Sequence, residues 1–401
     1  MLWCHGACIS LAYLPRALFL TLASLVNWAL GALEDRRFRD RIAAQQLHPE
    51  PVFILGHPRT GTTHMHNLLA HDGRFAYANT YQVGLPAHFL LTERYAWLLS
   101  WALASTRPMD NMALSFATPG EDELAVNVMS GGASPYMALA FMPRFRSILR
   151  LCSFDARGGD AEVADAAERW MTSFLWFLKK VTVADCLKRG GDGSAPRPLL
   201  IKSPVHTARA ELLLRLFPKA RFIFLHREPL EVFASAAPMA ASYFPFVYLT
   251  VSPATSLINQ SKITNQPIDQ PTNQPTNQPT NQPTNHRPPQ WPSDADVTDY
   301  TLLQHQILYA AYLRDRGAVP RGQLVEVAFA ELDGDPVAAM RRVYRALRWE
   351  ESWAAAEPAI RTYTGELAAF KKNDLRPLPP RLRARVEREC REAAEAFGYR
   401  G

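Results

Sequence analysis

The chain has 401 residues, of which 48% are hydrophobic and 20% charged, a balance typical of a globular protein rather than a fibre or a wholly disordered chain. Its formal net charge of +6 suits an anionic ligand or surface, but no dense run of Lys and Arg interleaved with aromatic residues indicates nucleic-acid binding. The five cysteines are scattered, without a C-x-x-C pair or histidines at zinc spacing, which argues against a disulfide framework and a metal site.

The first element along the chain is an apolar stretch, ALFLTLASLVNWALGAL, from Ala17 to Leu33, which precedes the charged stretch 34–41. It is marginal for crossing a bilayer, which needs about 20 apolar residues. It lacks the basic start and small-residue end of a signal peptide, and the arginines after it would hold the next domain in the cytoplasm. A helix packed on the domain, a helix on a membrane surface and a signal anchor remain open, so the location is either membrane-associated or cytoplasmic.

An alternation of strands and helices begins at Val52–Gly56, which predicts a short buried strand, followed by a loop and a helix that starts near Gly61. Much later, Pro198–Lys202 predicts a second strand, Val205–Phe217 an amphipathic helix, and Arg221–Leu225 a third strand. Strand, helix and strand at this spacing indicate a right-handed crossover in a parallel sheet.

A tandem repeat of four residues interrupts this pattern. Residues 264–287 read TNQPIDQPTNQPTNQPTNQPTNHR, with proline at every fourth position from Pro267 to Pro283. The segment has almost nothing apolar to bury and its prolines exclude a helix, so we expect a disordered, low-complexity insert over 252–296. Its regularity is more typical of a translated short DNA repeat than of a functional spacer.

After the insert, helices are predicted over Leu302–Leu313, Pro336–Leu347 and Pro380–Phe397, and a strand over Gln323–Val327. A single P-loop-like α/β domain, with a central parallel sheet flanked by helices, accounts for all of these elements.

The loop after the first strand, GHPRTGTT at residues 56–63, has the glycines of a nucleotide-binding P-loop but places Thr62 where the lysine should be. Its successive backbone N–H groups, at the N-terminus of a helix, predict an anion site. Neither the lysine nor a clear metal-binding aspartate at a strand end is present, so the loop suits a terminal group with less charge than a γ-phosphate, handled without a metal. A sulfuryl group has these properties.

The same loop resembles the 5′-phosphosulfate loop, G-x-x-R-S-G-T-T, of sulfotransferases that use 3′-phosphoadenosine 5′-phosphosulfate (PAPS). The run KSPVH at 202–206 resembles the K-S-P-x-H element of that family, and LHREP at 225–229 resembles the segment that follows it. The resemblance covers residues 50–245 and 298–400, with modest departures such as Thr60 for serine and Glu228 for aspartate.

The resemblance implies a PAPS-dependent sulfotransferase that moves a sulfuryl group to a hydroxyl acceptor by metal-free in-line displacement, with PAPS as co-substrate. The family's cofactor-binding residues map to Arg59, Thr60, Gly61, Thr62 and Thr63 of the loop and to Arg227 and Ser235, which would bind the 3′-phosphate. Lys202 and Arg59 would stabilise the charge on the departing phosphate. The sulfotransferase domain would consist of residues 50–251 and 297–401, split by the insert at 252–296 and preceded by a hydrophobic or amphipathic helical segment, 1–49.

A general base must also remove the proton of the acceptor hydroxyl. Candidates are the acidic residues 121–123, in a run PGEDE that resembles a P-x-E-D-E element of the same family, and two histidines, His57 and His206. We favour Glu123 first and His206 second, although the acidic cluster also suits an ordinary helix N-terminus.

The acceptor itself is expected to be a small molecule, a lipid or a carbohydrate with a hydroxyl group, and not a nucleic acid. Membrane association through residues 17–33 would favour a lipid alcohol. Apolar residues that could line its pocket are Trp97, Trp101, Met109, Met112, Tyr136 and Phe141, although ordinary core packing predicts the same composition. A P-loop kinase and a catalytically dead nucleotide-binding protein are the rival interpretations, the first disfavoured by the missing lysine.

Overall fold

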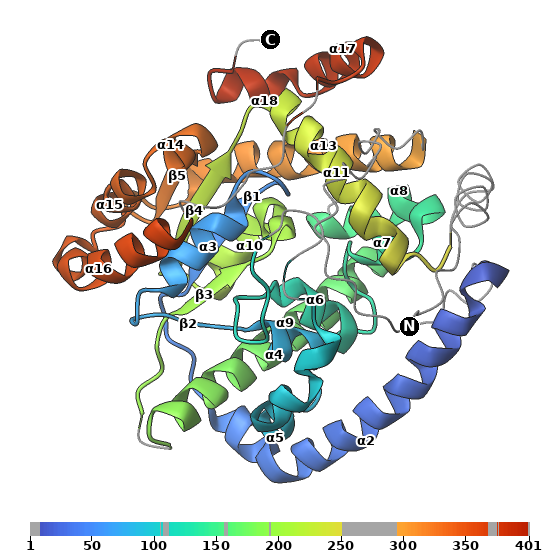
Figure 1. The fold of residues 1–401 in the computed structure, drawn as a ribbon, viewed down its shortest axis with the longest axis vertical. Helices are drawn as coiled ribbons and strands as arrows, with labels where there is room; N and C mark the ends of the chain where they lie inside the picture. The colour runs from blue at the N-terminus through green and yellow to red at the C-terminus, as the bar shows by residue number, and fades with distance from the viewer. Residues whose placement is uncertain are drawn as a thin grey trace, which may run out of the picture.

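A computed structural model describes residues 9–104, 106, 112–155, 159–191, 194–250, 295–367, 375 and 377–399 of the chain. In these residues, five parallel strands form one sheet with helices on both faces (Figure 1). The strands lie in the order β2-β3-β1-β4-β5 and comprise β1 Val52–Gly56, β2 Ala76–Tyr77, β3 Leu199–Lys202, β4 Arg221–His226 and β5 Leu324–Ala328. The predicted α/β class with a central parallel sheet is confirmed.

Strand β1 lies at the centre of the sheet and is buried along its whole length. Phe53 pairs with Ile201 of β3 on one side and with Phe222 of β4 on the other. Burial on both faces explains why this strand is a continuous apolar run rather than an alternating one. Because side chains alternate along a strand, its odd-numbered residues enter one core and its even-numbered residues the other.

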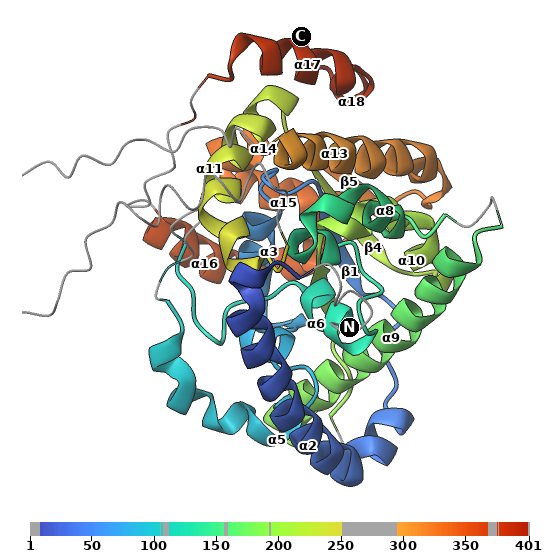
Figure 2. The same cartoon turned by 90° about the vertical axis from the view of Figure 1, so that its right-hand side faces the viewer.

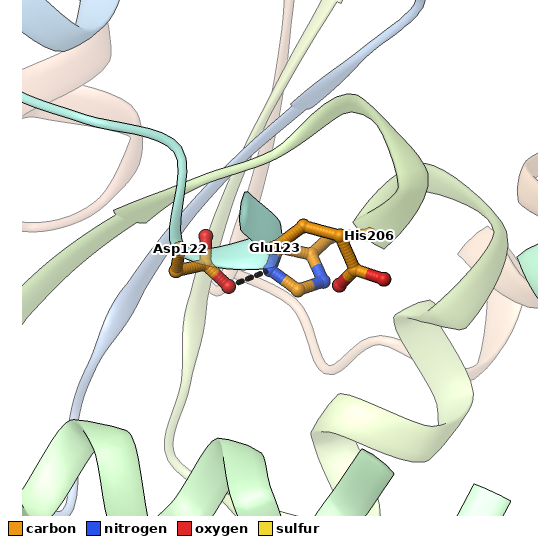
Figure 3. A group of neighbouring side chains, drawn as sticks. All are labelled: Asp122, Glu123 and His206. Atoms are coloured by element: carbon orange, nitrogen blue, oxygen red, sulfur yellow. Dashed lines mark hydrogen bonds and ion pairs between the residues drawn. The ribbon is translucent and has the colours of Figure 1, made fainter. Parts of the chain in front are cut away.

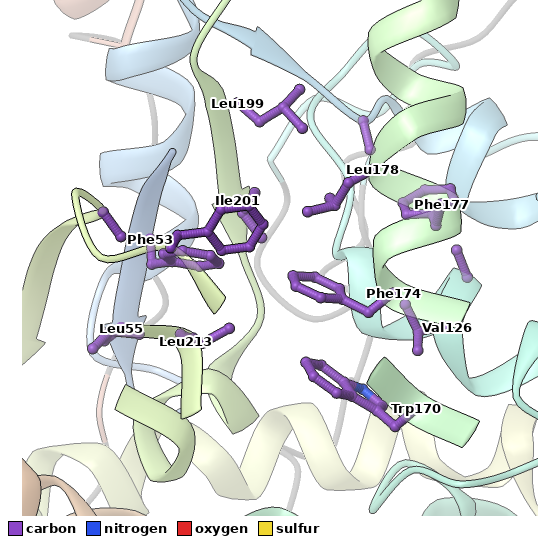
Figure 4. Close-up of a cluster of buried hydrophobic side chains, with 14 of the residues drawn as sticks. Phe53, Leu55, Val126, Trp170, Phe174, Phe177, Leu178, Leu199, Ile201 and Leu213 are labelled. Carbon is purple, nitrogen blue, oxygen red and sulfur yellow. The ribbon is translucent and has the colours of Figure 1, made fainter. Parts of the chain in front are cut away.

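The first core lies between the sheet and the long helix α9 (Ala161–Arg189). Figure 4 shows Phe53 and Ile201 of the sheet facing Phe174 of this helix. Each buried aromatic or aliphatic side chain of this kind stabilises the fold by about 1.5–3 kcal/mol. The sequence analysis missed α9, because residues 180–184 are all buried and the helix has no clear amphipathic period.

The second core covers the opposite face of the sheet. There α3 (Thr62–Ala70) and α15 (Pro336–Ala346) pack on the strands, and α16 (Glu350–Glu366) packs on these two helices. Both Ile54 and Met340 are fully buried in this core. The loop between β1 and α3 thus has a rigid layer of helices on each side.

Shorter helices complete the domain. They are α4 Thr80–Gly84, α5 Phe89–Thr92, η3 Glu93–Ala102, α6 Asp122–Met129, α7 Met137–Ala140, η4 Met142–Arg144, α8 Phe145–Ile148, η5 Leu149–Cys152, η6 Pro204–Arg209, α10 Ala210–Leu216, α11 Pro229–Val247, α13 Ala295–Asp315, η7 Arg316–Ala318, α14 Phe329–Gly334, α17 Pro380–Glu389 and α18 Arg391–Ala396.

The predicted strands are confirmed to within one residue at each end, whereas some helices differ. The segment 205–217 divides into the 3₁₀ helix η6 and the α-helix α10, and the segment 380–397 is broken at Cys390. Helix α13 begins at Ala295, inside the range expected for the insert. Residues 252–294 lie outside the described part of the chain, as does Met109.

The N-terminal segment forms one long helix, α2 (Leu14–Ala44), preceded by the 3₁₀ turn η2 (Leu11–Tyr13). It runs along the outside of the domain, in blue in Figures 1 and 2. Near its C-terminal end, the buried pair Glu34 and Lys180, with 2.5 Å between Oε1 and Nζ, ties it to α9. The N-terminal segment is therefore a helix packed on the domain along one of its faces.

Candidate active site

The loop between β1 and α3 leaves the sheet at its carboxyl edge, beside the ends of β3 and β4. The chain leaves β1 toward β3 and later crosses to β4 on the other side, so this is the switch point at which open α/β sheets bind ligands. Arg59 has a φ of 75° and Gly61, which precedes α3, a φ of 90°. Because both residues have a left-handed backbone conformation, the loop curls over the N-terminus of the helix.

Close packing explains both loop glycines. A Cβ on Gly61 would lie 2.7 Å from the Phe329 side chain, and one on Gly56 would lie 2.6 Å from the carbonyl oxygen of Leu225. The Thr60 hydroxyl donates to the carbonyl oxygen of His57 at 2.8 Å, which closes the turn from within. The loop thus has a fixed shape around its N–H groups, and its donors fit a phosphosulfate group.

Residues predicted for the 3′-phosphate meet beside the loop. Arg59 Nε donates to Ser235 Oγ at 3.0 Å, although the two residues are 176 positions apart. Arg227 Nη1 donates to the carbonyl oxygen of Arg59 at 3.2 Å, and its guanidinium lies 4.1 Å from the centre of the Phe329 ring. The Nε of the same arginine pairs with Glu231 at 2.9 Å. Two guanidinium groups and a hydroxyl therefore converge on one side of the loop, which suits a phosphate.

Lys202 lies at the end of β3, on the other side of the loop, with only 3% of its side chain exposed. Its Nζ is 2.6 Å from Glu121 Oε1 and 3.4 Å from Thr63 Oγ1. The other oxygen of Glu121 accepts a hydrogen bond from the Tyr136 hydroxyl at 2.5 Å. Burial, together with the negative charge of Glu121, raises the pKa of Tyr136 well above its usual value, so this tyrosine acts as a donor.

Glu123 occupies a different environment from Glu121, since it is completely buried and both of its oxygens are engaged. Oε2 accepts from Arg209 Nη1 and Trp170 Nε1, each at 2.9 Å, and Oε1 accepts from Ser134 Oγ at 2.7 Å. This carboxylate compensates a buried guanidinium, and these three partners all lie outside the loop. The geometry therefore does not favour the role of base that the sequence analysis gave it.

His206 is also directed into the protein interior. Its Nε2 is 2.7 Å from Asp122 Oδ2, and the ring packs edge-on against Phe53. The pKa of Asp122 lies below its usual value. Burial alone would raise this pKa, but the interactions with the His206 ring and the Ser203 hydroxyl lower it by more. The pair joins η6 to α6 and does not favour His206 as the base.

Asp122, Glu123 and His206 lie close enough together to suggest a metal site, with ligand atoms within 4.8 Å of one another (Figure 3). The donor set does not fit an ion, because Arg209 already neutralises Glu123 and the Ser203 hydroxyl donates to Asp122. The cluster is a buried polar network that fixes α6 against η6.

The remaining predicted residues lie apart from this site. His57 is buried behind the loop, where burial lowers its pKa to about 4 and its Nδ1 is 2.7 Å from the carbonyl oxygen of Pro58. Trp97 and Trp101, expected in an acceptor pocket, are exposed on η3, whereas Phe141 is buried next to α7.

The sequence analysis missed Thr207 and Phe329, and it named Tyr136 only as a possible lining residue of the acceptor pocket. Thr207 accepts a hydrogen bond from the N–H of Gly56 at 2.7 Å, Phe329 supports the loop and Arg227, and the Tyr136 hydroxyl binds Glu121. Only Thr207 carried a usable signal, since it directly follows the KSPVH run. The others come from distant segments that only the fold brings together.

Comparisons with known proteins identify the family and the fold. The model of a family described as "Sulfotransferase family" matches residues 51–252, and a second, described as "PT disordered repeat", matches residues 262–298. The omega-hydroxy-beta-dihydromenaquinone-9 sulfotransferase Stf3, from both Mycobacterium bovis and Mycobacterium tuberculosis, is 28% identical over 386 residues, covering 96% of this chain and 84% of the relative.

Solved structures share the fold. Sulfotransferase STF9 from Mycobacterium avium superposes with a TM-score of 0.56 at 18% identity, covering 92% of this chain and 81% of that one. Sulfotransferase STF1 from Mycobacterium tuberculosis H37Rv also gives a TM-score of 0.56, at 14% identity, covering 96% of this chain and 87% of that one. The chain belongs to the sulfotransferase family, whose members take their sulfuryl group from PAPS.

Proposed function

We propose that this sulfotransferase moves the sulfuryl group of PAPS to the hydroxyl group of a lipid alcohol by in-line displacement without a metal. One observation carries the proposal: Lys202 lies between the loop and a carboxylate, with its Nζ 3.4 Å from Thr63 and 2.6 Å from Glu121. A cation at the loop and a base beside it are the two groups that sulfuryl transfer requires of the protein.

The loop and its neighbours would hold PAPS at both of its anionic ends. Backbone N–H groups of residues 59–63 would bind the 5′-phosphosulfate at the N-terminus of α3. Arg59, Arg227 and Ser235, which already contact one another, would bind the 3′-phosphate. Each charge-assisted hydrogen bond of this kind contributes about 1.5–3 kcal/mol. PAPS supplies the activated sulfuryl group, and the residues supply orientation and charge.

Lys202 would stabilise the negative charge that develops on the departing phosphate. Its ammonium group is almost completely removed from solvent, where a fixed charge acts more strongly than in water. Together with Arg59 it would provide the positive charge that ATP-using P-loops obtain from a lysine and Mg²⁺. This arrangement supports a reaction that needs no metal.

Glu121 is the general base that the geometry supports. Its side chain is 27% exposed, whereas Glu123 is completely buried and saturated with donors. As the acceptor oxygen forms its bond to sulfur and the bond from sulfur to the phosphate oxygen breaks, the hydroxyl proton would pass to Glu121. The Tyr136 hydroxyl would hold the carboxylate in position throughout.

The similarity to a lipid-modifying relative supports a lipid acceptor. By its name, the relative acts on a hydroxylated menaquinone, which is a lipid with a terminal hydroxyl group. In this chain, the segment that follows Tyr136 enters an apolar cluster that contains Met137 and Phe141 together with Phe244 and Tyr248. An isoprenoid or acyl chain would find an apolar surface next to the base.

The first test is calorimetric titration with adenosine 3′,5′-bisphosphate, beside ATP with Mg²⁺, for the unmodified chain and for Arg227→Ala. We expect the bisphosphate to bind, ATP not to bind, and the variant to lose roughly 10- to 100-fold in affinity. Arg361→Ala, which changes an exposed arginine paired within α16, is the control that should bind normally. Binding of ATP in place of the bisphosphate would overturn the proposal.

A second measurement concerns the acceptor. Labelled PAPS is offered with a hydroxylated isoprenoid quinone and, separately, with a sugar alcohol. Transfer to the sugar but not to the quinone would retain the sulfotransferase reaction and reject a lipid acceptor.

A further inference from the structure

Helix α2 and the turn before it present leucines to solvent. They line one face of the helix, at steps of three or four residues from Leu11 to Leu25 and one step of eight, across the exposed Ala29, to the last leucine. Their exposed fractions lie between 48% and 83%, and we call them the leucine stripe: Leu11, Leu14, Leu18, Leu22, Leu25 and Leu33. Phe19 and Trp28, with exposed fractions of 68% and 74%, lie on either side. Residues at this spacing share a helix face, so the stripe is continuous.

Two polar residues of α2, Asn27 and Glu34, lie on the opposite, inward face. Asn27 Oδ1 is 3.0 Å from His88 Nε2, and the carboxylate of Glu34 is buried against Lys180. A surface helix of a soluble protein has the reverse arrangement, with apolar residues inward and polar residues outward. An outward apolar face with inward polar groups is the arrangement expected of a helix in contact with lipid.

Contacts along its length fix α2 to the domain. Arg16 Nη1 donates to the carbonyl oxygen of Tyr248 at 2.8 Å, Gly31 lies against Ala87, and the pair formed by Glu34 holds the far end. By length and composition alone, the segment could cross a membrane. Crossing would require these contacts to break or the domain to enter the lipid, so the structure favours a helix that lies along a membrane surface.

A second exposed group follows α5. We call it the η3 cluster: Tyr95, Trp97, Leu98, Leu99 and Trp101, with exposed fractions between 40% and 83%. The N–H of Leu91, in α5 directly before η3, donates to Glu34 of α2 at 3.2 Å, which ties the start of this region to α2. Tryptophan and tyrosine are enriched where a membrane meets water.

Exposed arginines lie beside both the leucine stripe and the η3 cluster. Arg36, Arg37 and Arg39 are exposed at the C-terminal end of α2, and Arg94 is exposed at the start of η3. The whole chain carries a net charge of +6. Arginines beside an apolar face attract anionic headgroups, a feature that a purely apolar contact with a second protein copy would not need.

We propose that the leucine stripe and the η3 cluster hold this enzyme on an anionic phospholipid bilayer, with α2 lying in the plane of the headgroups. In this orientation the N-terminal end of α2 adjoins the acceptor side of the site, because Ala17 packs in the same cluster as Met137 and Phe141. The docking does not depend on which acceptor is sulfated, so the two proposals can fail separately.

The test is flotation of the full chain with preformed vesicles of phosphatidylcholine, with and without one third phosphatidylglycerol. The stripe variant is Leu18→Ser, Leu22→Ser, Leu25→Ser, and the cluster variant is Trp97→Ser, Trp101→Ser. The matched control is Val128→Ser, which removes an apolar side chain that is 57% exposed on α6. Titration with adenosine 3′,5′-bisphosphate shows that each variant keeps its fold.

We expect binding to the anionic vesicles that weakens at least about tenfold in the stripe variant, falls in the cluster variant and is unchanged in the control. High salt should release the protein, as expected for a helix held at the surface. Equal flotation of the stripe variant, or no flotation at all, would overturn the proposal. The proposal would also be overturned if sedimentation showed a dimer that dissociates in the stripe variant while the protein does not bind vesicles. Retention of the protein in washed vesicles would instead show that the helix spans the bilayer.

Discussion

The two glutamates of the PGEDE run offer a matched pair of substitutions, Glu121→Gln and Glu123→Gln, that separates catalysis from stability. Glutamine keeps the size of the side chain but removes its charge and replaces one acceptor by a donor. At Glu123, the new amide would face donors from Arg209 and Trp170 in a site without solvent. At Glu121 the side chain is partly exposed and water can replace a lost partner.

The expected magnitudes differ accordingly. Removing one partner of a buried ion pair leaves an uncompensated charge, here on Arg209, and costs about 3–5 kcal/mol. That is a large part of the 5–15 kcal/mol by which a typical domain is stable. The pair of Glu121 with Lys202 is open to solvent on the carboxylate side, where Glu121 is 27% exposed, so water can replace the lost partner and its loss should cost less than that of the fully buried pair. Loss of a general base, by contrast, lowers the rate of turnover about 10²- to 10⁴-fold.

Urea unfolding followed by circular dichroism gives the stability of each variant, and single-turnover transfer from labelled PAPS gives its rate. Glu121→Gln should lose much less stability than Glu123→Gln and transfer slowly. Glu123→Gln should unfold at much lower urea, and its folded fraction should retain transfer. A stable Glu123→Gln protein without activity, together with an active Glu121→Gln protein, would refute the assignment of the base.

Other outcomes follow from the same contacts. Lys202→Met should lower the rate of transfer about 10²- to 10³-fold while adenosine 3′,5′-bisphosphate still binds, as kinetics and calorimetry would show. Replacement of residues 252–294 by a short Gly-Ser linker should leave turnover unchanged, because the residues on either side of the segment are close together: the rings of Phe244 and Tyr300 have centres 6.0 Å apart. An inactive product would contradict this expectation. Burial lowers the pKa of His57 to about 4 and the pKa of His305 well below 6.5. Below about pH 6.5 these histidines therefore take up protons when the chain unfolds, so the free energy of unfolding decreases as the pH falls. The decrease is about 1.4 kcal/mol per pH unit for each histidine. Urea unfolding of His305→Phe between about pH 7 and pH 5 should therefore show a shallower slope, and an unchanged slope would exclude this histidine as its source.

Local patterns in the chain were sufficient for most of the sheet and for the identity of the cofactor loop. The central strand is a short apolar run followed by glycine, and the strand at Leu199–Lys202 ends in a lysine where the resemblance places it. Short strands and loops with special backbone angles depend on neighbouring residues, so their signal lies within a few positions of the chain.

The long helix α9 and the choice of base could not be read in this way. Helix α9 is buried on several sides near its C-terminal end, which removes the periodicity that marks a surface helix. Glu121 and Glu123 are two residues apart in the same acidic run, and nothing local distinguishes them. Arg209 and Tyr136, which give them different surroundings, lie in other segments.

The sequence by itself predicted that an anion with a sulfuryl group binds at this loop, because the glycines, the missing lysine and the arginines follow one another in order along the chain. The tertiary structure decided which carboxylate meets Lys202 and which side of α2 faces outward. Both depend on burial, and burial is set by segments that are distant in sequence and adjacent only after the chain has folded.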